Sequence, residues 1–318
     1  MLRYNHKYLI FILLLTAFLS AEELQIYKQS SGLYNIQSEK NFQVEDKLYL
    51  SIDNYVGKII INGLSGGEIN IRENCDIKTY SENDARQKYY QSKVGFILNA
   101  NRLEISGKKH NYKINSVIEL DVPVFTTVKL EASDSQISLN QLDGDIELMS
   151  FDSDVDLTNV SSKVNLKSKN CEYNIFDCSM VGDLVLSRGT LFISGLNSEY
   201  FNATLYGADI NAESINSKVV FKSTGGNIII EESKNDAKLF TAGGNISVEE
   251  IYGNLACDTK GGIIEIGRVS GLCKINCVSG DVSVEEAWND INVEAVNTEV
   301  TIESALKSVY VETSKKDI

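Results

Sequence analysis

Apolar positions return with an 18-residue period over the second half of this chain. One phrase occurs four times in slightly different forms: Ser223-Thr-Gly-Gly-Asn-Ile-Ile-Ile230, Thr241-Ala-Gly-Gly-Asn-Ile-Ser-Val248, Thr259-Lys-Gly-Gly-Ile-Ile-Glu-Ile266 and Val278-Ser-Gly-Asp-Val-Ser-Val284. The first inward position of each repeat keeps the same period, with one step of 19: Ile137, Val155, Tyr173, Leu191, Ile210, Ile228, Ile246, Ile264, Val282 and Val300. A fixed period of this length is typical of a solenoid, in which each coil buries its apolar face against its neighbours.

Within one repeat, apolar and polar residues alternate in two short runs. Ile228 and Ile230 face one way and Ile229 the other, and the next run places Ala237 and Leu239 on one face. Each coil is therefore predicted to contain two strands. A third inward position follows five residues after the first, at the corner between the strands: Leu142, Val160, Cys178, Leu196, Ile215, Ser233, Ile251, Val269, Ala287 and Ala305, of which only the serine is polar.

The winding of the coils has two candidate forms. One period equals three hexapeptides, but a left-handed hexapeptide helix needs an aliphatic residue at every sixth position and would place Lys234 inside. Parallel strands joined by crossovers are right-handed in nearly all sheets. We therefore predict a right-handed parallel β-solenoid of about ten coils, which makes a rod on the order of 50 Å long at a strand spacing of about 4.8 Å.

Glycine pairs precede the phrase's apolar run, at Gly225-Gly226, Gly243-Gly244 and Gly261-Gly262. They are predicted to form turns that need a positive φ angle in every coil. The neighbouring Asn227 and Asn245 lie one coil apart, so their side-chain amides are expected to form a hydrogen-bonded ladder along the rod. Both roles are structural.

Residues 1–21 are predicted to be a secretory signal peptide. Arg3 and Lys7 precede an apolar run from Leu9 to Leu19, and the segment ends in small residues at Ala21. Its removal changes the formal net charge from −14 to −16. Such an acidic chain is not expected to bind nucleic acid. No later run is apolar for long enough to span a bilayer, so no stable membrane insertion is expected, and the mature chain should be secreted to the periplasm, the extracellular space or the cell surface.

Residues 22–131 have a less regular β pattern and are predicted to be an N-terminal β cap region, because the open end of a solenoid needs cover. The polar stretch from Ser81 to Ser92 within it has the composition of a short helix. Residues 132–318 carry the β-solenoid repeats.

Six cysteines in a secreted chain raise the question of disulfides: Cys75, Cys171, Cys178, Cys257, Cys273 and Cys277. On the 18-residue period, Cys257, Cys273 and Cys277 fall at inward positions, where a free thiol behaves as a small apolar residue. A bridge of Cys257 to a neighbouring coil, or of Cys171 to Cys178 across a turn, is left as an alternative.

The order of these features resembles the bacterial putative adhesin family of β-solenoid domains, formerly known only as a domain of unknown function. The resemblance rests on a leading strand pair from Leu48 to Ile61, an element Ile118-Glu-Leu-Asp-Val-Pro123, and turns of the form Gly144-Asp-Ile146 and Gly280-Asp-Val282. It covers roughly residues 45 to 311. It implies an all-β solenoid and an adhesive function, and it brings no catalytic residues. The middle coils depart from it, because they lack glycine turns at Ser153-Asp154 and Asn170-Cys171.

Candidate chemistry is sparse. His110 is the one histidine after the predicted signal peptide, and it lies in a polar connection. Gly-Gly-Asn turns lack the lysine and the helix of a phosphate loop. We therefore predict no catalytic residue, no cofactor-binding residue, no metal ligand and no cofactor.

Two groups of carboxylates leave alternatives open. The pairs Glu231-Glu232, Glu249-Glu250 and Glu285-Glu286 stack one coil apart, with Arg268 in the fourth slot, and a calcium-bridged edge is the alternative to a solvated rim. Outward acids at Asp145, Glu147, Asp154 and Asp156 are the alternative basis for a polysaccharide-cleaving site, which would also need basic partners on the same sheet.

The sequence as a whole predicts a secreted or cell-surface, non-enzymatic β-solenoid that acts as an adhesin-like interaction module. Its expected partner is a surface glycan or a protein, and the pattern defines no oligomeric state. The alternatives are a polysaccharide-acting β-helix enzyme, a lyase or a hydrolase, and a self-assembling extracellular scaffold.

Overall fold

The structure is a computed structural model that describes residues 23–44, 47–107 and 114–314. The predicted signal peptide, residues 1–21, and His110 lie outside the described residues. In the described part of the chain the one helix, α1 (Glu82–Ser92), has 11 residues and is too short and too polar to cross a membrane.

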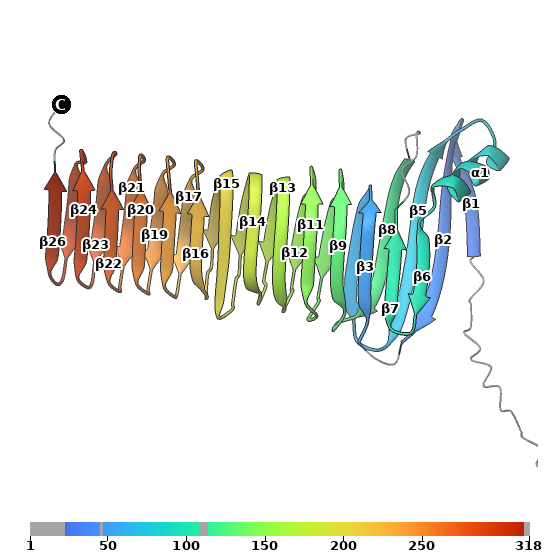
Figure 1. Ribbon diagram of the computed structural model, residues 1–318, viewed down its shortest axis with the longest axis horizontal. Coiled ribbons are helices and arrows are strands. Elements are labelled where there is room, and N and C mark those ends of the chain that lie inside the picture. The colour runs from blue at the N-terminus through green and yellow to red at the C-terminus, as the bar shows by residue number, and fades with distance from the viewer. Residues whose placement is uncertain (1–22, 45–46, 108–113, 315–318) are drawn as a thin grey trace, which may run out of the picture.

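The chain forms a flat β-solenoid with two sheets facing each other across a core (Figure 1). Sheet A runs in the order β6 (Gly95–Asn99), β7 (Arg102–Ser106), β3 (Tyr49–Tyr55), β9 (Thr127–Ser133), β11 (Ile146–Phe151), the first halves of β13 (Lys163–Phe176), β14 (Val181–Ser194) and β15 (Tyr200–Glu213), then β16 (Lys218–Ser223), β18 (Ala237–Thr241), β20 (Leu255–Thr259), β22 (Cys273–Cys277), β24 (Ile291–Val296) and β26 (Val309–Ser314). Sheet B runs in the order β1 (Glu23–Ser30), β2 (Leu33–Gln43), β5 (Glu68–Lys78), β8 (Ile114–Pro123), β4 (Lys58–Leu64), β10 (Gln136–Asn140), β12 (Asp154–Thr158), the second halves of β13, β14 and β15, then β17 (Ile228–Ser233), β19 (Ile246–Ile251), β21 (Ile264–Val269), β23 (Val282–Ala287) and β25 (Val300–Ala305). The predicted all-β solenoid is confirmed, whereas its right-handed sense stays a prediction.

The predicted period is the register of the parallel strands. Ile228 pairs with Ile246, Ile246 with Ile264, and Ile264 with Val282, so each partner lies one period further along the chain. The single longer step is also present, because Leu191 pairs with Ile210. Residues of the same repeat position therefore stack directly above one another along the rod.

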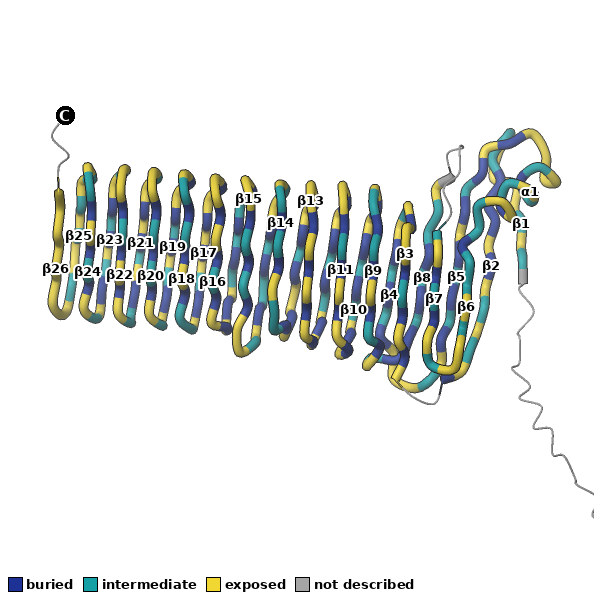
Figure 2. Tube along the Cα trace, in the orientation of Figure 1, coloured by how far each residue is buried: buried dark blue, intermediate teal, exposed yellow. Residues whose placement is uncertain are grey.

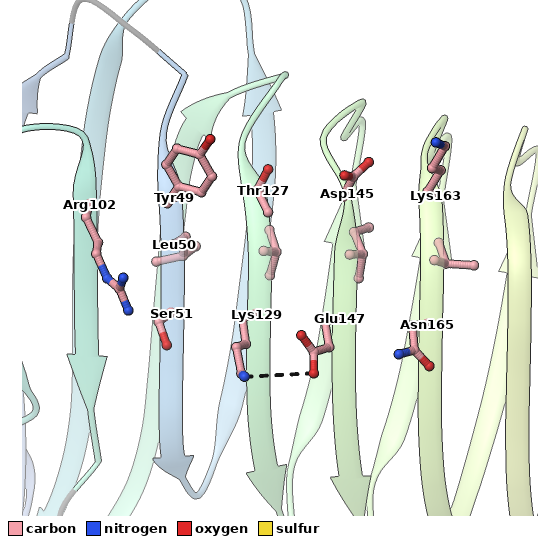
Figure 3. Close-up of a pocket in the computed structure, with 13 residues that line it drawn as sticks. Tyr49, Leu50, Ser51, Arg102, Thr127, Lys129, Asp145, Glu147, Lys163 and Asn165 are labelled. Carbon is pink, nitrogen blue, oxygen red and sulfur yellow. Dashed lines mark ion pairs between the residues drawn. The ribbon is translucent and has the colours of Figure 1, made fainter.

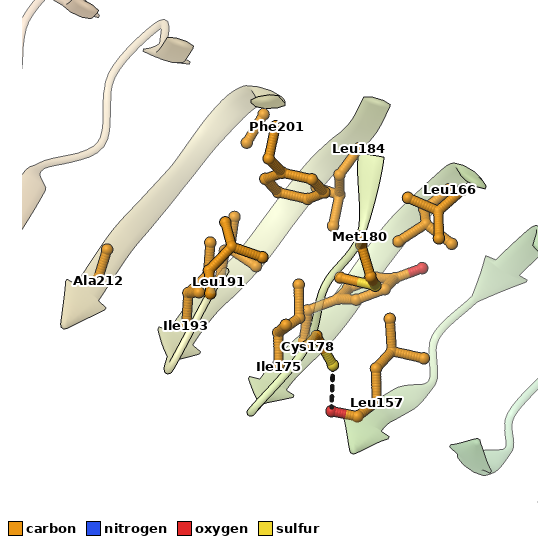
Figure 4. Packing of buried hydrophobic residues seen from close by; sticks show 14 of the residues in the cluster. Leu157, Leu166, Ile175, Cys178, Met180, Leu184, Leu191, Ile193, Phe201 and Ala212 are labelled. Carbon is orange, nitrogen blue, oxygen red and sulfur yellow. Dashed lines mark hydrogen bonds between the residues drawn. The ribbon is translucent and has the colours of Figure 1, made fainter. Parts of the chain in front are cut away.

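The core is one continuous column of apolar side chains between the sheets, seen as the dark blue bands that recur from coil to coil in Figure 2 and end before the last coil, β25 and β26. Aliphatic residues of neighbouring coils, such as Ile175 and Ile193, stack directly on one another (Figure 4). The corner position is buried from Leu142 to Ala287, as predicted, and Ser233 keeps its hydroxyl satisfied there by donating to the Asn235 carbonyl. Burial at this depth stabilises by about 25 cal/mol for each Å² of apolar surface removed from water.

Tyr173 is the bulky exception in the first inward column. Its ring is fully buried, and its hydroxyl lies 2.5 Å from the Ser168 hydroxyl, which in turn lies 2.6 Å from that of Ser150. A buried hydroxyl without a partner would cost roughly 1–3 kcal/mol, so this short network is what allows a tyrosine inside the rod.

The corners are built in two ways. In the earlier coils a single residue with a left-handed backbone turns the chain from sheet A to sheet B, and it recurs at the repeat spacing: Asp134, Asp152, Asn170, Arg188 and Gly207. Asn and Asp tolerate this conformation better than other residues with a side chain. The middle coils therefore turn without glycine pairs.

The glycine pairs serve a different purpose, and the predicted need for positive φ in every coil was wrong. Among the pairs none has a left-handed φ, and Gly280 of the fourth phrase is the exception, at 134°. The second glycine is required because the coils approach closely there. A Cβ on Gly244 would lie 2.1 Å from the carbonyl oxygen of Gly226, and one on Gly262 would lie 2.0 Å from that of Gly244. The first glycine of each pair has open space around it.

The asparagines next to these glycines do form a ladder, but with the backbone. The side-chain oxygen of Asn227 accepts a hydrogen bond from the backbone N–H of Asn245 at 2.9 Å, and Asn245 accepts one in the same way from Ile263. A ladder in which side-chain amides bond to one another, the kind predicted for Asn227 and Asn245, runs along the opposite edge from Asn197 through Asn216 to Asn235.

The N-terminal region departs most from a simple stack. The coil formed by β3 and β4 lies between the coil formed by β7 and β8 and the coil formed by β9 and β10, so the order along the rod differs from the order along the chain (Figure 1). Beyond β8, strands β5, β2 and β1 continue sheet B in antiparallel fashion, and β6 continues sheet A antiparallel to β7.

Helix α1 covers this end of the molecule, within the stretch where the sequence predicts a short helix. Ser81 caps it by accepting a hydrogen bond from the backbone N–H of Asp84 at 3.2 Å. Ala85 and Tyr89 of α1 pack into a small second core with residues of β2 and β5. A helix and an antiparallel sheet thus close the head of the rod.

All six cysteines are buried and have free thiols. The interpretation of Cys257, Cys273 and Cys277 as core residues is confirmed, and neither alternative bridge is formed. Burial raises the pKa of the Cys178 thiol to about 11 and that of the Cys273 thiol to about 12, so both stay protonated at neutral pH.

The close approach at the glycine pairs gives a matched test. We expect Gly244→Ala to lower the free energy of unfolding by about 1–3 kcal/mol, because the new Cβ overlaps the coil beneath. Gly243→Ala should change it by no more than about 0.5 kcal/mol, since nothing lies within 4 Å of its Cβ. Denaturant unfolding followed by circular dichroism measures both. Equal losses would contradict the assigned contact.

The register gives a second test. Deletion of the segment from Gly244 to Gly261 removes one whole coil, so Gly262 and Ile264 take over the places of Gly244 and Ile246. We expect a shorter protein that still unfolds cooperatively. Deletion of half that segment, from Gly244 to Tyr252, should abolish cooperative unfolding because it places turn residues against the inward columns. Similar melts for the two deletions would refute the period.

Candidate functional site

The two outer faces of the solenoid differ in charge. Outward lysines on sheet A are Lys129, Lys163, Lys167, Lys169, Lys218, Lys222, Lys238 and Lys274. They are interspersed with the outward carboxylates Asp53, Glu104, Glu131, Glu147, Asp183, Asp258, Glu294 and Glu312. Sheet A is therefore mixed in sign, although the chain as a whole is strongly acidic.

Sheet B is acidic along its length. Its outward carboxylates are Asp154, Asp156, Glu172, Asp209, Glu213, Glu231, Glu249, Glu265, Glu285 and Glu303. No lysine projects from sheet B between β10 and β25, all of whose residues the structure describes. Sheet B should repel anions, and any anionic partner is directed to sheet A.

Sheet A also carries the two hollows that matter most. The first, of about 430 Å³, lies over β7, β3, β9, β11 and β13 (Figure 3). Its rim combines Arg102 and Lys163 with Asp145, and Lys129 forms an ion pair of 3.8 Å with Glu147. The Oγ1 atom of Thr127, in the middle of this hollow, is buried and has no hydrogen-bond partner.

The second hollow on sheet A, of about 400 Å³, lies over β16, β18, β20 and β22. The small side chain of Ala256 opens it, because Ala256 pairs with Lys238 on one side and with Lys274 on the other. Lys222 and Phe240 lie on the next outward row, paired with each other. Neither Lys222 nor Lys238 forms an ion pair with a described residue. Asp258 also lines the hollow, between Phe240 and Asn276, so three lysines stand beside one carboxylate there.

The two hollows lie on the same face of one rod. From β9 to β20 there are seven steps between neighbouring strands of sheet A. At about 4.8 Å for each step, the centres of the hollows are roughly 34 Å apart. An extended polymer is a ligand long enough to contact both.

The predicted acidic edge is neutralised in part from within. Arg268 lies between the carboxylates of the neighbouring coils, with Nη1 2.6 Å from Glu250 and Nε 2.9 Å from Glu286. Its guanidinium also lies 5.7 Å from the ring of Trp288. The indole of Trp288 and then Arg268 hold the pKa of Glu286 below its usual range. The like-charge repulsion that a calcium ion would relieve is thus met here by an arginine.

A third hollow, of about 290 Å³, lies on the cap over β2, β5 and β8. Its cation, Arg72, is already paired, at 3.0 Å with Glu119 and at 2.8 Å with Asp121. These carboxylates raise the pKa of Arg72. The charge in this hollow is therefore satisfied within the protein, unlike that of the hollow around Ala256.

The four acids weighed for a polysaccharide-cleaving site are divided between the faces. Glu147 lies on β11 of sheet A and Asp145 in the turn before it, and both line the first hollow. Asp154 and Asp156 lie on β12 of sheet B, where Asp156 accepts a hydrogen bond from Asn174 at 2.9 Å. Only the first pair has basic residues beside it.

A metal site requires several ligating side chains to lie close together. Throughout residues 23–44, 47–107 and 114–314 no three side chains of His, Cys, Asp or Glu come together closely enough to hold an ion. The described cysteines are buried core residues, as shown above. What the sheets offer chemically is hydrogen bonding and charge.

Both hollows were missed by reasoning from the sequence, although a signal for them was present. Once the 18-residue period assigns the outward positions of the repeats to the two sheets, the lysines fall on one sheet only, without coordinates. The small residue Ala256 at an outward position then marks where the surface of the sheet is lowered. The first hollow also needs β3 beside β9, which no period predicts.

Comparison with known proteins adds the following. No protein family and no curated protein matches the sequence. Similar solved structures include a putative adhesin from Parabacteroides merdae ATCC 43184 (13% identity, 88% of this chain and 96% of that chain, TM-score 0.30). Another is a putative cell adhesion protein from Clostridium sporogenes ATCC 15579 (13% identity, 72% of this chain and 98% of that chain, TM-score 0.21). A third is a putative lipid binding protein from Parabacteroides distasonis ATCC 8503 (10% identity, 88% of this chain and 97% of that chain, TM-score 0.31). The neighbours include putative adhesins, the kind of protein that the repeats resemble. At these TM-scores the likenesses carry no conclusion about function.

The arginine at the acidic edge leads to a prediction on pH. Because the pKa of Glu286 is lowered in the folded chain, ionised Glu286 favours folding above its unfolded pKa, and this contribution is lost as the pH falls through the folded pKa. We expect Trp288→Phe and Arg268→Gln each to raise the pKa of Glu286 toward its usual range, the first by more. Carboxyl titration by carbon-13 NMR measures it. An unchanged pKa in both variants would contradict the assigned contacts.

Proposed function

We propose that the protein is a non-enzymatic, adhesin-like interaction module of the cell surface or extracellular space. Its partner is an extended, negatively charged polymer that lies along the outer face of sheet A. The observation that supports this proposal is that outward lysines lie along sheet A, whereas sheet B carries carboxylates and no lysine between β10 and β25.

The geometry of sheet A supports a long partner over a compact one. Its outward rows run straight along the rod because equivalent residues stack in register. The two hollows interrupt these rows at separate places on one face. A polymer that follows the rows can place anionic groups near several lysines at once, and such multiple contacts add up even when each is weak.

A second candidate function has one observation in its favour. The hollow over β9 and β11 brings Asp145 and Glu147 together with Arg102, Lys129 and Lys163. Polysaccharide cleavage needs an acid, a base and a charge stabiliser in one place, and these residue types are present. The ion pair of Glu147 with Lys129 is exposed, however, and a solvated pair of this kind is ordinary on a protein surface.

The experiment measures binding of the purified protein to acidic polysaccharides such as alginate and polygalacturonate, by isothermal titration calorimetry at low salt. We expect binding that weakens as salt is added, because exposed charges are screened beyond about 10 Å at 0.1 M. Lys167→Glu on sheet A should weaken binding about tenfold, through the lost attraction and the added repulsion. Lys58→Glu, which makes the same charge change on sheet B, should leave it within about twofold.

The same samples separate the two candidate functions. We expect no reducing ends and no unsaturated sugars above a boiled control, with or without calcium. Product that is lost in Glu147→Gln would establish the enzyme instead. Equal weakening by Lys167→Glu and Lys58→Glu would contradict the assignment of sheet A as the binding face.

A further inference from the structure

In the hollow around Ala256, two lysines of the same outward row lie on either side of a small residue. Lys238 and Lys274 lie two strands apart on one outward row, with Ala256 between them. At about 4.8 Å for each strand, their backbones are roughly 10 Å apart. An anionic group seated over Ala256 would lie between two ammonium groups, with the carboxylate of Asp258 on the next outward row.

The hollow also holds an acceptor that nothing in the protein satisfies. The Oδ1 atom of Asn276, which lines it, is buried and has no hydrogen-bond partner, and the same is true of Oδ1 of Asn292 on the neighbouring β24. Asn292 pairs directly with Lys274. A buried carbonyl oxygen without a donor costs roughly 1–3 kcal/mol. A turn of the Asn276 amide that brings Oδ1 to the surface of the hollow, where a ligand hydroxyl can donate to it, would remove this cost.

An aromatic ring completes the set. Phe240 lines the hollow on the row next to Lys238. Its side chain projects outward from the sheet and is partly buried. It pairs with Lys222 on β16, so a flat apolar surface lies beside a third ammonium group. Aromatic rings offer an apolar face on which the C–H face of a sugar ring can pack.

From these contacts we infer that the hollow lined by Lys222, Lys238, Phe240, Ala256, Lys274 and Asn276, with Asp258 as its one carboxylate, is a binding site for a carboxylated sugar unit of an acidic polysaccharide. The carboxylate lies between Lys238 and Lys274, a ring hydroxyl donates to Asn276, and the sugar face packs on Phe240. This inference rests on the proposed function, whose ligand class it specifies.

The combination of groups favours an acidic sugar over an acidic protein segment. Both carry carboxylates that the lysines attract. A sugar acid also presents hydroxyl donors on the carbons next to its carboxylate, where Asn276 needs them. Lys274 is already within 3.7 Å of Glu294, with both side chains about half exposed, so this weak pair gives way to a ligand at little cost.

The test measures the affinity of an oligogalacturonate for the intact protein and for single variants by isothermal titration calorimetry. Lys238→Gln and Lys274→Gln should each weaken binding about tenfold, the range expected for loss of one hydrogen bond to a charged group. Ala256→Leu should weaken it by a similar factor with no change of charge, because it fills the hollow. Lys58→Gln on sheet B is the matched control and should bind like the wild type.

Two further ligands test the chemistry of the site. The methyl ester of the oligogalacturonate, which lacks the charge, should bind at least tenfold more weakly than the acid. Poly-L-glutamate keeps the charge without hydroxyls, so Asn276→Leu should weaken oligogalacturonate binding and leave poly-L-glutamate binding unchanged. Thermal melts by circular dichroism confirm that each variant is folded.

The outcomes separate the inferred site from the proposed function. If oligogalacturonate binds but the hollow variants behave like Lys58→Gln, the inferred site is wrong and the proposed function stands. If poly-L-glutamate binds as tightly and Asn276→Leu has no effect on either ligand, the site recognises charge alone and the sugar is overturned. If no acidic polymer binds, the proposed function itself fails and the site with it.

Discussion

The stacking of identical positions, coil upon coil, is the constraint on which the rest of this protein depends. Parallel strands exchange backbone hydrogen bonds at a fixed spacing, so whatever stands at one repeat position must tolerate its own copy about 4.8 Å away. Inside the rod this favours aliphatic columns. At the turns it requires glycine, since a Cβ on Gly244 would overlap the carbonyl oxygen of Gly226. At the edges it turns isolated asparagines such as Asn227 and Asn245 into ladders.

The same constraint explains how much of the fold could be predicted from the sequence. The 18-residue register assigned the inward column from Ile137 to Val300, the buried corners and the core thiols, because each repeat supplies the same evidence again. The prediction was less good where repetition stops. The predicted role of the glycine pairs was wrong, because a glycine in the sequence does not show whether a positive φ or a close approach between coils requires it. The order of β7, β3 and β9 was not foreseen either, because a coil inserted from earlier in the chain has no periodic signal.

Function follows from what the stacking leaves outside. Outward positions stack in register just as inward ones do, so residues of like charge come to lie next to one another on one face. An oppositely charged residue in the stack relieves this repulsion, as Arg268 does between Glu250 and Glu286. Sheet B accumulates carboxylates and sheet A carries the lysines, so in the proposed function it is sheet A that an anionic polymer approaches. Small residues such as Ala256 lower the surface locally, and the inferred site uses this hollow to hold a single unit of that polymer.

Chemical footprinting of lysines tests the central claim most directly, because it reports every exposed ammonium group in one experiment. The protein is acetylated with and without an acidic polysaccharide, and the labelled positions are quantified by mass spectrometry. Binding along sheet A predicts that the polysaccharide protects Lys222, Lys238 and Lys274 and leaves Lys58 on sheet B as reactive as before. Protection of Lys58 to the same extent, or no protection on sheet A under conditions where the polysaccharide is bound, would contradict it.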